Sequence, residues 1–145
     1  MYRSYKLDRM GEIEDPGFFR AKSMTSIANA NLSTRAKLVA YILLSYWSAK
    51  RPRPFPCVGT IARQAGMSDA SVRKALRELE QALAIRTTRT KARGSNTYSI
   101  SGLLHLPEIT GEEWAEKKKS LQQIQKKRNK KRDERASELR KLDIN

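Results

Sequence analysis

The chain has 145 residues, which suits one compact domain with an appendage and leaves little room for a second full domain. Lysine and arginine number 30 against 15 acidic residues, so the net charge is +15 and a polyanionic partner is the first expectation. One cysteine and one histidine exclude a disulfide framework and a zinc site of Cys and His ligands, and no apolar run suits a membrane span or a signal sequence. We therefore expect a protein of a reducing cytoplasm that needs no cofactor.

The charge is unevenly distributed and predicts three segments. Residues 1–31 form an N-terminal arm with a net charge of +1, whose aromatic residues either close over the domain or mediate dimerisation. Residues 32–102 hold thirteen basic and three acidic groups and most of the aliphatic pattern, so this segment is both the core and the electrostatic face. Residues 103–145 form a basic tail.

The first predicted helix of the domain runs from about Ser33 to Ser48. Ser33 is a good N-cap, and apolar residues recur after it at helical spacing: Ala36, Val39, Ala40, Leu43 and Trp47. A helix this apolar is expected at the centre of a small domain, with Trp47 in the core. The three prolines of Lys50–Pro56 then predict an extended linker.

Two further helices follow across a short turn. A helix from Val58 is predicted to end at Gly66, which supplies a left-handed C-cap, and Ser68 caps the next helix from Asp69. The predicted buried stripe of that third helix is Val72, Ala75, Leu76, Leu79 and Leu83. Its opposite face presents Ala70, Lys74, Arg77 and Gln81, with Arg73 beside them.

After Leu83 the pattern becomes typical of strands. Ile85–Arg89 and Asn96–Ile100 are rich in β-forming residues and flank a basic, glycine-containing turn at 90–95, which predicts a β-hairpin with a charged tip. The predicted fold class is therefore mainly α with a small β-hairpin (α+β).

The tail begins with a capping-box pattern, Thr110 to Glu113, and its composition favours a helix. Residues 126–132 contain six basic residues in seven and interrupt the apolar spacing, so a long coiled coil is not expected. Two interpretations remain open: a solvated, partly frayed helix, or a helix that binds the DNA backbone or a partner.

The order of helix, short helix, turn, cationic helix and basic hairpin resembles a winged helix-turn-helix. Residues 61–80 (IARQAGMSDASVRKALRELE) resemble that motif in bacterial regulators and in the N-terminal domains of plasmid and phage replication proteins. Residues 32–37 (LSTRAK) resemble the start of the first helix in the second group. The resemblance implies double-stranded DNA as the partner, with the helix from Asp69 in the major groove and the hairpin on the backbone or minor groove.

The expected groove contacts are Ser68, Asp69, Ala70, Ser71, Arg73, Lys74 and Arg77, and the expected wing contacts are Lys91 and Arg93. Arginine and lysine are the commonest readers of guanine in the major groove, which supports the cationic face as the reading surface. The alternative is a solvated face whose cations pair with Glu78 or Glu80. At the hairpin tip, the alternative is a turn kept soluble by its charge.

These observations favour a non-enzymatic, sequence-specific DNA-binding protein, a transcriptional repressor or a repeat-binding maintenance or segregation factor of a plasmid or other mobile element, associated with the nucleoid or plasmid. A replication initiator is the alternative, although initiators with this resemblance usually carry a further domain. An RNA-binding protein would use charge without groove geometry, and a DNA-processing enzyme would need clustered carboxylates or an activated nucleophile. A homodimer or a cooperative oligomer on DNA is possible, and no membrane partner is expected.

Overall fold

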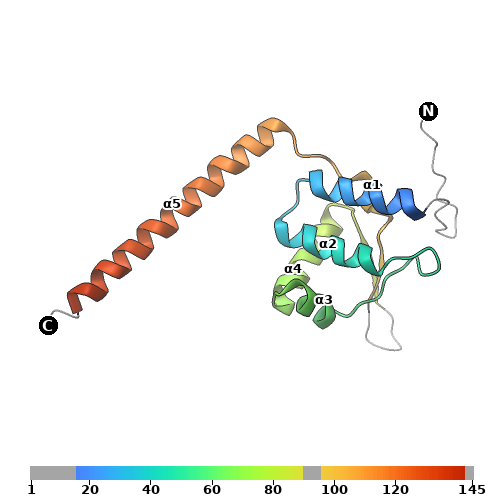
Figure 1. The fold of residues 1–145 in the computed structure, drawn as a ribbon, viewed down its shortest axis with the longest axis horizontal. Coiled ribbons are helices and arrows are strands. Elements are labelled where there is room, and N and C mark those ends of the chain that lie inside the picture. The colour runs from blue at the N-terminus through green and yellow to red at the C-terminus, as the bar shows by residue number, and fades with distance from the viewer. Residues whose placement is uncertain (1–15, 90–95, 143–145) are drawn as a thin grey trace. The chain divides into compact units, whose positions relative to one another are not determined.

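The computed structural model describes residues 16–89 and 96–142 (Figure 1). Its elements are α1 (Pro16–Asn29), α2 (Thr34–Tyr46), α3 (Val58–Ala65), α4 (Asp69–Gln81), β1 (Arg86–Arg89), β2 (Asn96–Ser99), the 3₁₀ helix η1 (Ser101–His105) and α5 (Gly111–Leu142). The predicted class, mainly α with a small hairpin, is confirmed.

Helix α2 is the central element of the fold, as its apolar sequence predicted. It contacts α1 on one side and both α3 and α4 on another, and Figure 1 shows α1 and α4 on opposite sides of it. Ser33 is the N-cap, and its hydroxyl accepts a hydrogen bond from the Ala36 amide at 3.2 Å. The helix ends at Tyr46, two residues before the predicted end, because Trp47 has extended backbone and turns its buried ring into the core.

Helix α1 belongs to the same core as the helices that follow it. Phe19 is buried against Trp47, with ring centroids 4.5 Å apart, and Arg20 donates a hydrogen bond to the Trp47 carbonyl at 2.9 Å. The arm's Phe19 thus closes over the first predicted helix. The side chain of Leu103 is also buried in this core, and the first of the chain's two units ends at Glu108.

The turn between α3 and α4 follows the predicted chemistry. Gly66 has left-handed backbone, with φ of 63°, and the Met67 amide donates to the Ala62 carbonyl at 3.1 Å. Ser68 then caps α4 with a hydroxyl that accepts from the Ser71 amide. The buried residues of α4 are Val72, Ala75, Leu76 and Leu79, which form the predicted stripe without its last member.

Leu83 is not part of that stripe, and the prediction that it is buried was wrong. Helix α4 ends at Gln81, and Leu83 takes left-handed backbone with φ of 56° and leaves 83% of its surface exposed. Its amide donates to the Glu80 carbonyl, and the Ala84 amide donates to the Leu79 carbonyl. These two bonds form a Schellman motif, in which a leucine stands at the position that glycine usually takes.

Strands β1 and β2 form the predicted antiparallel hairpin, with Thr87 opposite Tyr98 and Arg89 opposite Asn96. Residues opposite one another in such a pair project from the same face, so one face of the hairpin carries these four side chains. Tyr98 is buried, and its amide donates to the Pro54 carbonyl of the proline-rich linker at 2.9 Å. The linker thus fixes the hairpin against the helices.

Helix α5 begins with the predicted capping box. The Thr110 amide donates to the Glu113 carboxylate at 2.8 Å, and the Glu113 amide donates to the Thr110 hydroxyl at 3.2 Å. Its 32 residues lie in the second of the chain's two units, which begins at Ile109. Among the residues that the structure describes, no helix is both long and apolar enough to cross a membrane.

Candidate nucleic-acid interface

The outer face of α4 presents its cations to solvent. Arg73, Lys74 and Arg77 are all exposed, as are Ala70 and Gln81. Within the described part of the chain none of the three cations forms an ion pair; the one bond of Arg77 runs from Nε to the Arg73 carbonyl at 3.4 Å. Their charges are therefore available to an external anion.

Glu78, one of the two acids considered as partners for these cations, is held elsewhere. Its carboxylate accepts hydrogen bonds from the Ser33 amide at 2.6 Å and from the Ser33 hydroxyl at 2.7 Å. This places a negative group at the N-terminus of α2, where the helix dipole favours it. Glu78 thus ties α4 to α2 and leaves the cationic face unneutralised.

The first turn of α4 holds the remaining predicted contacts. Ser68 accepts from the Ser71 amide and also donates to the Ser71 hydroxyl at 3.1 Å, so both serines serve the cap. Asp69 and Ala70 are exposed beside them. The predicted residues on α4 thus lie together at one end and along one face of a single helix.

A hollow of about 650 Å³ lies on one flank of α4. Helix α3 contributes its N-terminal residues, α4 contributes one edge, and the hairpin contributes the face that carries Thr87 and Arg89. Its full lining is Cys57, Val58, Gly59, Asp69, Arg73, Leu76, Arg77, Glu80, Thr87, Arg89 and Asn96. Three guanidinium groups and the positive end of the α3 dipole outweigh two carboxylates, so the hollow favours an anion.

Two titratable groups lie at or near this hollow. Cys57 is exposed at the N-cap of α3, and a hydrogen bond with the Thr60 side chain, 3.2 Å away, lowers the pKa of its thiol. A lone cysteine in a loop is expected to behave as a small apolar side chain, yet the Cys57 side chain is exposed to solvent. Tyr98 is buried, and this burial raises the pKa of its hydroxyl.

The other flank of α4 has a second hollow, of about 420 Å³. The start of α2 lies beside α4 here, and the lining is Ser33, Thr34, Arg35, Ser71, Lys74, Ala75 and Glu78. The exposed cations Arg35 and Lys74 both line it. The protruding face of α4 is therefore bordered on both sides by concave surfaces that carry basic groups.

Sequence reasoning missed two of these cations. The strand pairing would have indicated Arg89, because its partner Asn96 and the hydroxyl of Thr87 share its face. Arg35 comes beside α4 only through the packing of α2 on that helix, which no local pattern reveals. Lys91 and Arg93, the predicted wing contacts, lie outside the described residues, so their role stays a prediction.

The comparison with protein families agrees with this geometry. Residues 30–82 match the family described as a helix-turn-helix domain, a range that contains α2, α3 and α4. No curated protein matches the chain. The matched helices and the antiparallel hairpin after them fit a winged helix-turn-helix DNA-binding domain.

Proposed function

We propose that this protein is a sequence-specific double-stranded DNA-binding protein that reads bases with the outer face of α4. The observation that carries the proposal is the exposed group of Arg73, Lys74 and Arg77, which have no acidic partner in the described structure and project from one helix of a helix-turn-helix domain. A major groove about 12 Å wide admits one helix, and bidentate arginine contacts distinguish guanine from the other bases.

The two flanks of α4 supply backbone contacts in this proposal. When a helix enters a major groove, the phosphates of both strands lie on either side of it. Arg35 and Lys74 line the hollow on one flank of α4, and Arg89 lines the hollow on the other flank. These side chains fix the register of α4 on the duplex, whereas Arg73 and Arg77 carry most of the base discrimination.

The biological role that we propose is that of a transcriptional repressor or a repeat-binding maintenance or segregation factor of a plasmid or other mobile element. Either role requires the protein to occupy a DNA site and to catalyse no reaction. The exposed basic side chains on and beside α4 are suited to binding DNA in this way. The protein then acts in the cytoplasm, on the nucleoid or plasmid. Origin binding in replication would use the same surface, and the positions of the bound sites separate these roles.

The experiment is selection of bound duplexes from a fragment library of the host replicon, followed by footprinting. We expect one enriched motif, with sites in promoters for a repressor, in repeats for a segregation factor or at an origin for an initiator. Half-sites spaced by about 10 base pairs would indicate a dimer. No enriched motif, or preferential competition by structured RNA, would contradict the proposal.

A further inference from the structure

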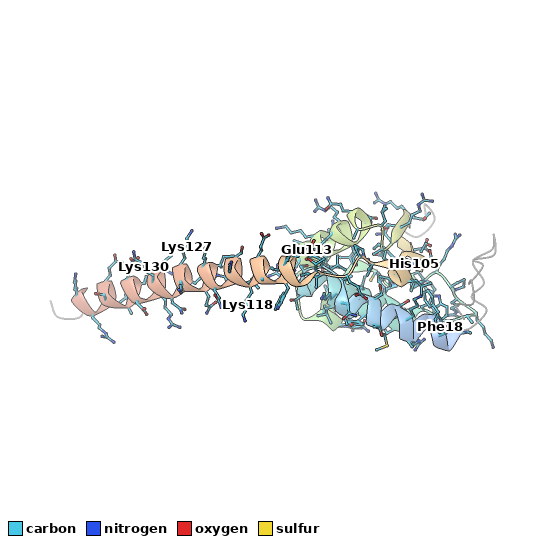
Figure 2. The ribbon with its side chains drawn as sticks, turned by 90° about the horizontal axis from the view of Figure 1, so that it is seen from above. Phe18, His105, Glu113, Lys118, Lys127 and Lys130 are labelled. Carbon is cyan, nitrogen blue, oxygen red and sulfur yellow. The ribbon has the colours of Figure 1, made fainter. Side chains whose placement is uncertain are left out.

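The middle of α5 carries a dense band of positive charge that the winged helix-turn-helix does not explain. Residues 117–132 contain nine basic residues and no acidic one: Lys117, Lys118, Lys119, Lys126, Lys127, Arg128, Lys130, Lys131 and Arg132. We call residues 117–132 the basic band. All the described side chains of α5 other than Lys117 are exposed, and side chains project from both sides of the helix in Figure 2.

The basic band repels itself as a helix in water. Lys126 and Lys130, Lys127 and Lys131, and Arg128 and Arg132 are like-charged pairs spaced by four residues, and each such pair destabilises a helix. Two exposed ion pairs link the C-terminal end of the band to the acids that follow it, Lys130 with Glu134 and Arg132 with Asp133, both at 3.9 Å. An external polyanion would relieve this repulsion.

The distribution of the charges selects among polyanions. Successive helical residues advance by about 100°, so Lys117, Lys118 and Lys119 point to three different sides. A helix that lies on a membrane needs an uninterrupted apolar face opposite its cations, and here Arg128 and Lys131 interrupt the spacing of Leu121 and Ile124. A helix with cations on all sides fits between the two phosphate rows of a duplex groove.

We infer that the basic band is a second DNA contact, which binds duplex phosphates without regard to sequence. This inference rests on the proposed function, because the winged helix-turn-helix brings the duplex to the tethered band at high effective concentration. The band is about 24 Å long at 1.5 Å per residue, the length of about seven base pairs of duplex. Because a major groove admits one helix, the groove that α4 occupies has no room for the band, which needs further duplex for its contact.

The test compares two triple variants of the full-length chain that remove the same charges. The variant R128Q/K131Q/R132Q removes three positive charges from the basic band. The control R135Q/R140Q/K141Q removes three positive charges from the C-terminal part of the same helix, where the carboxylates of Asp133, Glu134 and Glu138 repel phosphate. Affinity is measured from 50 to 200 mM salt on a specific duplex, on a random duplex of equal length, and on a specific duplex trimmed to the α4 footprint. Helicity by circular dichroism is the folding control.

Loss of three phosphate contacts lowers the slope of log affinity against log salt by about 2.7, because each contact contributes about 0.9. We expect this smaller slope for the band variant on both long duplexes. Between 50 and 200 mM salt, the affinity of the wild type should therefore fall by a factor about 40-fold larger than the affinity of the band variant does. On the trimmed duplex we expect no difference from the wild type, and the control variant should change the slope by less than about one.

Equal effects of the two variants, or none on the long duplexes, would overturn the inference while leaving the proposed function intact, since the wild type would still select its site. If the wild type bound no duplex at low salt, the proposed function itself would fail. Unchanged duplex binding with loss of binding to anionic vesicles or structured RNA would also overturn the inference.

Discussion

Leucine is an unusual residue at position 83, because its backbone is left-handed and its side chain is almost wholly exposed. The conformation costs an L-residue about 1–2 kcal/mol, and the exposed side chain returns little burial in compensation. The strain lies where α4 meets the wing, so the Schellman motif sets the direction in which the hairpin leaves the helix.

Leu83→Gly is expected to raise the free energy of unfolding by about 0.5–1 kcal/mol, because glycine adopts this backbone freely but loses more chain entropy on folding. Urea denaturation measures the change. Leu83→Ala removes the same side chain without relieving the backbone, so it should be close to neutral. An alanine variant as stable as the glycine variant would show that the side chain, not the backbone, is responsible.

Gly102 is required by close packing against this turn. A Cβ at position 102 would collide with the Leu83 carbonyl oxygen and lie 2.8 Å from the Ala84 carbonyl oxygen. Both neighbours are backbone atoms that cannot move aside cheaply, so Gly102→Ala should destabilise the domain by more than about 2 kcal/mol in thermal unfolding. Gly111→Ala is the control, since a Cβ added there would meet nothing within 4 Å. A wild-type melting temperature for Gly102→Ala would refute this close approach.

At the scale of elements, the hydrogen bonds between Ser33 and Glu78 couple α2 to α4. Glu78→Gln keeps a partner for the Ser33 amide and for the Ser33 hydroxyl but removes the negative charge from both bonds and from the N-terminus of α2, so we expect a loss of about 1 kcal/mol in stability. Chemical denaturation checks the value. Glu80→Gln removes the same charge from the same helix and should cost less than about 0.5 kcal/mol. Similar losses for both variants would mean that net charge, not this contact, is at work.

Helices α2, α3 and α4 were predictable from sequence because each has an apolar stripe and a local signal at its start or its end. Ser33, Gly66 and Ser68 perform the roles that their residue types indicate. The end of α4 was not predictable, because left-handed backbone at a leucine follows from tertiary packing rather than from propensity. Whether the arm's aromatic residues close over the domain was left open by the sequence, since it depends on the contact of Phe19 with Trp47 across the fold.

At the scale of the whole molecule, the buried core runs from Phe19 to Leu106 and α5 adds charge rather than buried apolar surface. A chain ending at Glu108 should therefore unfold cooperatively, with a melting temperature within a few degrees of the full-length value. Circular dichroism at increasing temperature tests this directly. Loss of the cooperative transition would show that α5 contributes to the stability of the domain.

The central claim is that the outer face of α4 reads DNA sequence, and one measurement tests it most directly: the affinity of Arg77→Ala for the selected site and for random duplex of equal length. If Arg77 reads a base, its replacement by alanine should weaken the binding free energy by about 1–3 kcal/mol on the selected site and by much less on random duplex. Lys22→Ala is the control, because it removes one charge from α1, on the far side of α2 from α4. The account predicts that Arg77→Ala narrows the specificity ratio while its melting temperature stays at the wild-type value. The account would be contradicted if Arg77→Ala left the ratio of specific to random affinity unchanged, or if Lys22→Ala lost as much affinity for the selected site.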